Sequence, residues 1–404
     1  MYNRVMENSR FKIEITDISD RGEGIGKADG LAVFVPGTLP GDIAEVEITE
    51  DKGRFAKAKL ISLAEPSKDR VEPACQKALE CGGCPLMGLS YDAQLKLKEK
   101  HVHDALTRIA GLEDPKINPI IAADNPYHYR NKGEFAVDME QIGYYKASTH
   151  KIVPAKDCLI QDDLIMDALA EFSAELSEKP RKNLKRVTIR SSRSGETMLI
   201  CEYKNDDKTA STRVLHDEIT TDMGTLKTEV SPLSFYQVNP AQCSKLYGKV
   251  QEYAALTGEE SVLDLYCGAG SIGLSMASKA KKIIGVEVVR DAVIDANRNA
   301  VINGIVNDQF ICGKAEEVLP AKLQGVHADV VILDPPRNGC DSALLESVCS
   351  INCRRLIYVS CNPATLARDL KYLTANGFRF VEATPCDMFP QSLHTECIVL
   401  MMRS

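Results

Sequence analysis

The sequence predicts an α/β protein whose largest part is a doubly wound, Rossmann-like sheet. Strand and helix signals alternate from Val262 to the end of the chain, which is typical of parallel sheets covered by helices on both faces. Short β-type runs cut by Gly and Pro fill the start of the chain, and a mixed, cysteine-containing region follows them. At 404 residues the chain is too long for one hydrophobic core. We therefore expect domains at residues 1–64, 65–234 and 235–404.

Composition indicates an ordinary globular protein without a membrane segment. Hydrophobic residues make up 44% and charged residues 26% of the chain. A membrane span needs about 18 consecutive apolar residues, and the sequence has no such run; the N-terminus also lacks the apolar core of a signal peptide. We therefore expect a cytoplasmic location, where 14 cysteines would stay reduced. A net charge of −8 gives no support to a nucleic-acid partner, but it says little about any single basic face.

Residues 1–64 are predicted to form a small OB-like β-barrel of five strands, because alternating runs are joined by Gly-rich turns. Within it, four cations of the stretch DKGRFAKAKL (residues 51–60) surround Phe55. Cations interleaved with an aromatic side chain suit the backbone and bases of a nucleic acid. Lysines that protect a solvated edge strand explain the stretch equally well. A second basic strip, from Lys182 to Arg193, is likewise open to both interpretations.

Residues 65–234 are predicted to form a central mixed α+β domain. Three of its cysteines, Cys75, Cys81 and Cys84, fall within ten residues, and Cys158 follows at a distance. Three clustered thiolates and one distant thiolate suit an iron–sulfur cluster, whereas paired CxxC knuckles would have favoured zinc. Spacing alone leaves zinc as an alternative. The radical-enzyme spacing Cys-x3-Cys-x2-Cys is absent, so we expect a structural or RNA-positioning role rather than redox catalysis.

The stretch Asp264 to Leu274, DLYCGAGSIGL, follows a predicted strand and opens a helix. Its glycines allow a ligand to approach the backbone, and Glu287 ends the next strand at the distance expected of an acid that binds both ribose hydroxyls. The loop lacks the pyrophosphate-binding pattern GxGxxG, so adenosine without phosphates fits better than NAD. S-adenosylmethionine is therefore the predicted cofactor, and a tight turn without a ligand is the competing interpretation.

Two further strand ends are predicted to face the same crevice. One carries Asp334 in the stretch DPPR, where two prolines stiffen the loop. Methylases of exocyclic amines carry an aromatic residue after the prolines; Arg337 stands there instead, which weakens amino-group methylation without excluding it. The other strand ends at Cys361, between Ser360 and an Asn-Pro turn. Buried cysteines usually fill cores, but Cys361 alone lies at such a tip.

A cysteine nucleophile suits the methylation of a carbon that is not itself nucleophilic, such as C5 of uracil. Addition of a thiolate at C6 makes C5 nucleophilic, and a base must later remove the C5 proton. A thiol needs help to ionise at neutral pH, and we expect the dipole of a helix starting near Thr365 to provide it. Glu396 is the predicted base, with His394 as the runner-up.

Taken together, these residues resemble the RNA uracil-C5 methyltransferases, specifically the 23S rRNA group with an N-terminal TRAM domain and an iron–sulfur cluster. The resemblance covers nearly the whole chain. It rests on the cysteine spacing and on FYQVNP (235–240), DLYCGAGSIGL (264–274), DPPR (334–337), SCNPATLARD (360–369) and HTECIVLM (394–401).

The resemblance implies a class I methyltransferase domain behind a TRAM barrel, a 4Fe-4S cluster on the four cysteines, and a helix near residues 90–115 that packs on the catalytic domain. It implies donor-binding roles for Gln237, Tyr266, Glu287 and Asp334, and it implies Cys361 as nucleophile and Glu396 as base. Ser271 stands where some relatives have Asn. The expected partner is 23S rRNA and the expected state is a monomer.

Three alternatives stay open at this point. They are methylation of a tRNA T-loop uridine, amino-group methylation, and a non-catalytic RNA-binding assembly factor.

Overall fold

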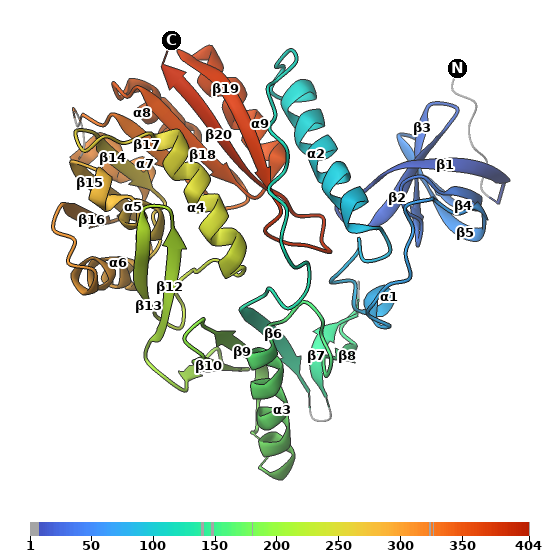
Figure 1. Ribbon diagram of the computed structural model, residues 1–404. Helices are drawn as coiled ribbons and strands as arrows, with labels where there is room; N and C mark the ends of the chain where they lie inside the picture. Colours follow the sequence, from blue (N-terminus) through green and yellow to red (C-terminus); the bar gives the residue numbers. More distant parts are fainter. Residues whose placement is uncertain are drawn as a thin grey trace. The chain divides into compact units, whose positions relative to one another are not determined.

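The computed structural model (Figure 1) describes residues 8–138, 141–146, 149–179, 181–322, 325 and 327–403. The chain forms two compact units. One comprises residues 1–97, 144–153 and 391–393, and the other comprises residues 98–143, 154–390 and 394–404. The predicted boundaries after residues 64 and 234 stay predictions, because a division into two units does not test a division into three domains.

The first unit begins with a closed five-stranded barrel, as predicted. The strands follow the order β1-β2-β3-β5-β4. Side chains alternate along each strand, so that in β4 Ala44, Val46 and Ile48 are buried while the intervening glutamates face outward. The bounds are β1 (Arg10–Ile18), β2 (Glu23–Ala28), β3 (Leu31–Pro36), β4 (Ile43–Asp51) and β5 (Phe55–Glu65).

A short helix, α1 (Ala78–Cys81), follows the barrel. It ends because Gly82 adopts the left-handed conformation, with φ of 68°, and its N–H donates to the carbonyl of Ala78. The longer α2 (Tyr91–Arg108) comes next, and its residues from Lys98 onward belong to the second unit.

The second unit contains an antiparallel sheet in which β11, β10, β9, β6 and β7 are successive neighbours. Helix α3 begins where the side chain of Asp162 accepts a hydrogen bond from the N–H of Leu164. A hairpin, β12 and β13, leads towards the large sheet. Residues 144 and 145 of β7 and residues 152 and 153 of β8 belong to the first unit. The bounds are β6 (Lys132–Val137), β7 (Ile142–Tyr145), β8 (Ile152–Pro154), α3 (Asp163–Glu178), β9 (Leu184–Ser191), β10 (Thr197–Tyr203), β11 (Lys208–Ala210), β12 (Leu215–Thr221) and β13 (Gly224–Val230).

The large sheet has seven strands in the order β16-β15-β14-β17-β18-β20-β19. The first five are parallel, and β20 runs antiparallel to both β18 and β19. Counted along the chain, the order is 3-2-1-4-5-7-6, which reverses direction next to β14 and so creates a crevice there. The bounds are β14 (Ser261–Leu265), β15 (Lys282–Glu287), β16 (Asp308–Cys312), β17 (Val330–Leu333), β18 (Arg355–Ser360), β19 (Phe378–Cys386) and β20 (Glu396–Arg403).

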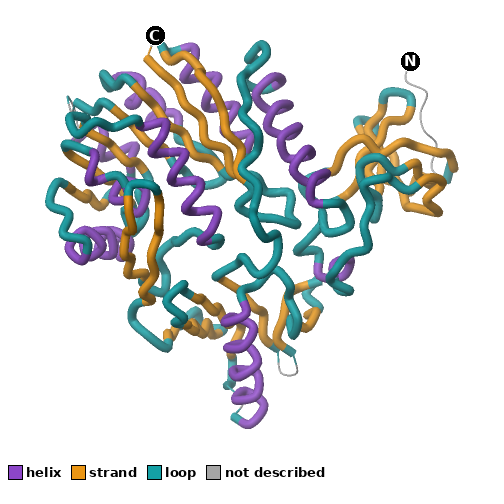
Figure 2. Tube along the Cα trace, in the orientation of Figure 1, coloured by secondary structure: helices purple, strands orange, loops and turns teal. Residues whose placement is uncertain are grey.

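Helices cover both faces of this sheet, as Figure 2 shows by colour. Leu333 and Tyr358 point to one face, with α7, α8, α9 and the later residues of α2, including Leu106. Ile332 and Ile357 point to the other face, which α4 and α5 cover. The helices are α4 (Pro240–Ala254), α5 (Ser271–Ser275), the 3-10 turn η1 (Ala277–Lys279), α6 (Arg290–Ile302), α7 (Ala315–Lys322), α8 (Ser342–Ser350) and α9 (Pro363–Ala375).

Within the described residues, we find no helix that combines the length and the apolar character needed to cross a membrane.

Candidate active site

The carboxyl ends of β14, β15 and β17 bring three of the predicted donor-binding residues together. The register pairs Leu265 with Val286 on one side and with Leu333 on the other. Continued by one residue, it places Tyr266 between Glu287 and Asp334. The loop after β14 then turns sharply, since Tyr266, Gly268 and Gly270 all have positive φ, of 65°, 54° and 78°. This conformation is costly for a tyrosine and signals a local constraint.

Backbone amides of this turn hold two acids in place. The N–H of Gly268 donates to Oε2 of Glu287 (3.0 Å), and the N–H of Gly273 donates to Oδ2 of Asp264 (3.0 Å). At Gly268 a Cβ would meet nothing within 4 Å, so the turn leaves open space in front of its backbone. At Gly270 a Cβ would lie 2.8 Å from the Phe310 ring, which explains the glycine there.

Two acids of the crevice, Asp264 and Asp334, form no ion pair with any residue that the structure describes. Asp264 is fully buried, and its Oδ1 has no hydrogen-bond partner within the part of the chain that the structure describes. Burial, together with the nearby Asp334 and Glu287, raises the pKa of Asp264 to about 7. Burial raises the pKa of Asp334 to about 7 as well, although Asp334 keeps partial contact with solvent in the crevice. An orphaned carboxylate oxygen and unpaired acids fit a cationic ligand such as a sulfonium.

Cys361 and Glu396 face each other across the end of two antiparallel strands. The register of β18 and β20 pairs Ser360 with Cys397, so the next pair is Cys361 with Glu396. Residues opposite each other in such a ladder have Cβ atoms about 5 Å apart. Cys361 is partly exposed, whereas Cys386 and Cys397 are fully buried in the core.

Glu396, Cys361, Asp334 and Arg337 influence one another's ionisation. Burial is the main cause that raises the pKa of Glu396 to about 8, and Asp334 adds to it while Arg337 opposes it. Burial likewise raises the pKa of Cys361 to about 11; Glu396 and Asp334 add to the rise, and Arg337 lowers it. The expectation that a helix dipole helps Cys361 to ionise stays a prediction. The helix concerned, α9, begins at Pro363, two residues after Cys361.

Arg337 and His394 form a pair beside this site. Nη2 of Arg337 lies 3.0 Å from Nε2 of His394. A guanidinium only donates, so Nε2 accepts and the imidazole carries its proton on Nδ1. Burial, then Arg337, Lys98 and Arg130, lower the pKa of His394 to about 4. An imidazole with an occupied lone pair and so low a pKa is a weak base, which favours Glu396 over His394.

Gln237 lies in a segment that several hydrogen bonds fasten in place. Its carbonyl accepts from Nδ2 of Asn131, and Ser231 and Ser234 both bond the buried carboxylate of Asp295. Phe235, two residues before Gln237, is nevertheless 66% exposed. Sequence reasoning missed this side chain, although an aromatic residue beside a predicted ligand residue was a usable signal.

Ser271 is the position where some relatives have Asn. In the structure its Oγ lies 2.6 Å from the hydroxyl of Tyr247, so it fastens α5 to α4. The hydroxyl of Ser271 therefore has a hydrogen-bond partner within the protein.

The four predicted cluster cysteines are all partly exposed. Cys75, Cys81 and Cys84 belong to the first unit, around α1, and Cys158 belongs to the second. Among the described residues, no group of three or more His, Cys, Asp or Glu side chains is arranged to hold a metal ion. The structure therefore does not support the predicted iron–sulfur cluster.

The two predicted basic surfaces are less basic than their sequences suggest. On the barrel, Lys59 pairs with Glu47, and Lys52 and Lys57 both pair with Glu50. In the later strip, Arg190 is buried and its Nη2 donates to the carbonyl of Ser234. Arg190 therefore does not belong to a solvated basic face.

Comparisons with known proteins agree with this geometry. The family described as tRNA (uracil-5-)-methyltransferase matches residues 175–404, and the TRAM domain matches residues 4–61. An uncharacterized RNA methyltransferase of Caldanaerobacter subterraneus is 40% identical and covers 99% of this chain and 100% of its own. The chain belongs to the RNA uracil-5-methyltransferase family. This methyltransferase is also 38% identical to an uncharacterized RNA methyltransferase of Bacillus cereus, over 99% of this chain and 98% of the other.

Among solved structures, this methyltransferase is similar to the tRNA (uracil-54, C5)-methyltransferase of Pyrococcus abyssi in complex with S-adenosyl-L-homocysteine. The TM-score is 0.75 at 25% identity, over 97% of this chain and 100% of that one. The protein is thus an S-adenosylmethionine-dependent RNA (uracil-5-)-methyltransferase with an N-terminal TRAM barrel. The prediction of an enzyme is confirmed against the non-catalytic alternative.

Proposed function

We propose that this methyltransferase methylates C5 of a uridine in 23S rRNA through a covalent bond between Cys361 and C6 of the base. The observation that carries the chemistry is the register that sets Cys361 opposite Glu396 at the crevice. A nucleophile and a base about one strand spacing apart can act on adjacent carbons of one pyrimidine ring.

The donor site is proposed at Gln237, Tyr266, Glu287 and Asp334. Glu287 would accept the ribose hydroxyls, and Asp334 and Asp264 would face the positive charge. When bound, the donor would supply a methyl carbon that accepts the electron pair of C5 while its bond to the sulfonium sulfur breaks, leaving S-adenosylhomocysteine. Its positive charge also offsets the acids around Cys361, which lowers the pKa of the thiol towards the working range.

The protein residues then act in order. The thiol of Cys361 loses its proton to solvent, the thiolate Sγ bonds to C6, and the C5=C6 electrons move towards O4 of the uracil. Arg337, which already favours the ionised forms of Cys361 and Glu396, would stabilise that developing negative charge. After methylation the carboxylate of Glu396 removes the C5 proton, the C5=C6 bond re-forms, and Sγ leaves. A pKa of about 8 suits a carboxylate that must accept and later release a proton near neutral pH.

Phe235 is proposed to hold the RNA base. Its ring is exposed, while the backbone around it is fastened by Asn131 and Asp295. A base that leaves its stack to reach a buried nucleophile needs an aromatic surface in return, and stacking of this kind contributes about 1–3 kcal/mol per base.

The iron–sulfur cluster stays a prediction, and no catalytic step is assigned to it. The support is the spacing of Cys75, Cys81, Cys84 and Cys158 and the partial exposure of all four thiols. Iron and sulfide analysis of protein purified without oxygen tests it, with a Cys81→Ser, Cys84→Ser variant as the control. Equal iron content in both proteins would exclude the cluster.

A tRNA uridine is the second candidate substrate. The TRAM barrel favoured rRNA, since the usual bacterial tRNA enzymes of the family lack it. However, the Pyrococcus abyssi tRNA enzyme aligns over its whole length with 97% of this chain, so the barrel does not separate the two RNAs. Nucleoside mass mapping of rRNA and tRNA from a deletion strain decides between them. We expect 5-methyluridine to disappear from 23S rRNA and to persist in tRNA.

The chemistry is tested with RNA that carries 5-fluorouridine at the target. Fluorine replaces the proton that Glu396 removes, so the adduct persists and can be seen as a protein–RNA band. We expect the band with the natural enzyme and none with Cys361→Ala. An adduct that persists in Cys361→Ala would overturn the proposed nucleophile.

A further inference from the structure

The loop after β17, residues 336–340, places Arg337 beside the crevice. A cavity lies along one side of this loop. Its residues Pro336, Asn338, Gly339 and Cys340 line a cavity of about 920 Å³. Because side chains do not fill this space, hydrogen bonds must hold the loop in place. The structure shows where they come from.

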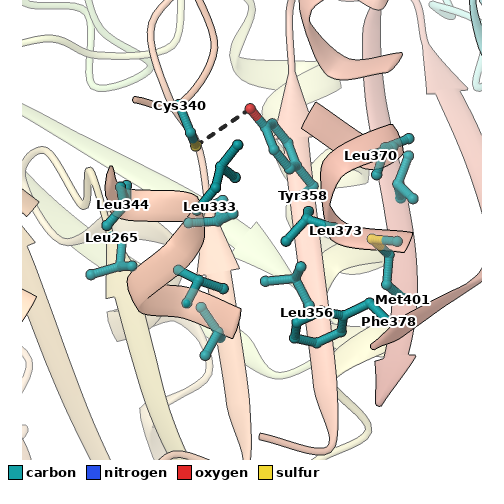
Figure 3. Close-up of a cluster of buried hydrophobic side chains, with 14 of the residues drawn as sticks. Leu265, Leu333, Cys340, Leu344, Leu356, Tyr358, Leu370, Leu373, Phe378 and Met401 are labelled. Atoms are coloured by element: carbon teal, nitrogen blue, oxygen red, sulfur yellow. Dashed lines mark hydrogen bonds between the residues drawn. The ribbon is translucent and has the colours of Figure 1, made fainter. Parts of the chain in front are cut away.

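The buried carboxylate of Asp369, in α9, lies at the centre of these bonds. Asp369 is fully buried. Its Oδ2 accepts from the hydroxyl of Tyr358 (2.6 Å) and from the N–H of Cys340 (2.8 Å), and its Oδ1 accepts from Nε of Arg368 (2.8 Å). One carboxylate thus joins β18, α9 and the loop. Figure 3 shows Tyr358 and Cys340 meeting above the packed leucines of this face.

Arg368 extends the attachment along the loop. Its Nη2 donates to the carbonyls of Asn338 (3.0 Å) and Cys340 (3.3 Å). Gly339, with φ of 76°, lies so close that a Cβ there would be 2.5 Å from Nη2 of Arg368 and 2.6 Å from Oδ2 of Asp369. The loop backbone therefore rests directly on this pair of charged side chains.

The same loop is also tied to the segment that carries the nucleophile. The carbonyl of Arg337 accepts from Nδ2 of Asn362 (3.2 Å) and from Oγ1 of Thr365 (3.1 Å). Asn362 directly follows Cys361 and caps α9 through its Oδ1. The backbone of Arg337 is thus fixed relative to Cys361 by bonds at both ends of the loop, and its guanidinium bonds His394.

We infer that Asp369 is a positioning residue, which holds the 336–340 loop so that the guanidinium of Arg337 stays beside Cys361. This inference rests on the proposed nucleophile. Cys361 is faced by Glu396 from β20 and by Asp334 and Arg337 from the loop after β17. Displacement of the one cation in that set leaves two acids, which disfavour the thiolate. Among the described hydrogen bonds Asp369 has none to the donor turn at Gly268. It does act on Tyr266 of the proposed donor site, which lines the same cavity, so donor affinity has to be measured beside the rate.

The test uses Asp369→Asn in the full-length enzyme, with the rate of covalent adduct formation on 5-fluorouridine RNA measured against pH. We expect the rate near neutral pH to fall about 100-fold, the size expected from a misplacement of about 1 Å. We also expect the rising limb of the pH profile to move to higher pH, and donor affinity measured by calorimetry to stay within about twofold. A change that was merely structural would lower the rate at every pH without moving the profile.

A second variant keeps the test decisive if Asp369→Asn fails to fold. Tyr358→Phe removes a single hydrogen bond to Asp369 and retains the packing, so we expect a loss of about tenfold and a smaller shift of the same sign. Tyr253→Phe is the matched control, because it removes another buried hydroxyl, which is bonded to Thr384 (2.6 Å), and we expect no shift.

The outcomes separate this inference from the proposed function. An unmoved pH profile in both Asp369→Asn and Tyr358→Phe, or a donor affinity that falls as much as the rate, overturns the role of Asp369. An adduct in Cys361→Ala overturns the proposed nucleophile instead.

Discussion

The pKa of a buried carboxyl group is lowered in the barrel but raised in the crevice. In the first unit, burial alone would raise the pKa of Asp42, but two bonds of 2.6 Å from Arg70 and the amides of Ser67 and Leu39 outweigh it, and the pKa is lowered. In the crevice, burial raises the pKa values of Asp264 and Asp334 to about 7, and no cation in the described part of the chain offsets it.

This difference distinguishes a carboxylate that stabilises the fold from carboxylates that a ligand would complete. A buried carboxylate that is fully bonded stabilises its surroundings, whereas one without a partner costs stability and persists where a ligand completes it. Asp42 joins the end of β3 to the segment after β5. The crevice acids have no such partner among the described residues, and we propose that a cationic donor balances their charge. We therefore expect removal of a crevice carboxylate to change activity or donor affinity, and removal of the Asp42 carboxylate to change stability.

The largest effect is expected at the crevice, from Glu396→Gln. Loss of the base should lower turnover about 10³-fold, within the range for general base catalysis. Since the C5 proton can no longer be removed, a covalent adduct should accumulate on unmodified RNA, which denaturing gel electrophoresis detects. Turnover close to that of the natural enzyme would assign the base to another residue.

The next effect is expected in the barrel, from Asp42→Asn. Removal of the charge leaves Arg70 with a weaker acceptor, and we expect the free energy of unfolding to fall by about 2 kcal/mol, measured by urea denaturation. Because folding lowers the pKa of Asp42, its contribution is present above the unfolded value of about 3.8 and is lost as the pH falls through the folded value. Donor affinity should not change, and a change would contradict the proposed separation of roles.

A smaller effect is expected on donor affinity, from Asp334→Asn. We expect the Kd for S-adenosylmethionine to rise about tenfold at pH 8, measured by calorimetry. For the natural enzyme, affinity should increase as the pH rises through about 7, because a cationic donor favours the ionised form of a carboxyl whose pKa is about 7.

The neutral product S-adenosylhomocysteine is the control for this pH dependence. Without the sulfonium charge it should show a weaker increase, and the Asp334→Asn variant should show a smaller increase with either ligand. Equal pH dependence for the two ligands in the natural enzyme would show that the acids do not respond to the charge of the donor.

The smallest effect is expected at the barrel surface, from Glu47→Gln. Glu47 bonds Lys59 and Arg10, which lower its pKa, but both cations are well exposed to solvent. Exposed pairs of this kind contribute little and are screened by salt. We expect no measurable change in the thermal midpoint, and a shift as large as that of Asp42→Asn would show that the pair is more than a surface contact.

The sequence by itself determined the outline of this protein. The alternation of side chains predicted the barrel, the alternation of strands and helices predicted the Rossmann-like sheet, and both are observed. The sequence around Asp334 and Cys361 also identified these two residues as candidates, because each follows a strand whose end faces the crevice of such a sheet.

Only the tertiary structure decided which side chains lie opposite each other and how their pKa values shift. The register that sets Cys361 opposite Glu396 joins strands separated in the chain, and the pKa of the thiol is raised by burial and by acids that follow or begin other strands. The bonds of Asp369 to Tyr358 and Cys340 likewise join three elements. Local patterns report which face of a strand or helix is apolar, but pKa values and loop positions depend on neighbours that only folding brings together.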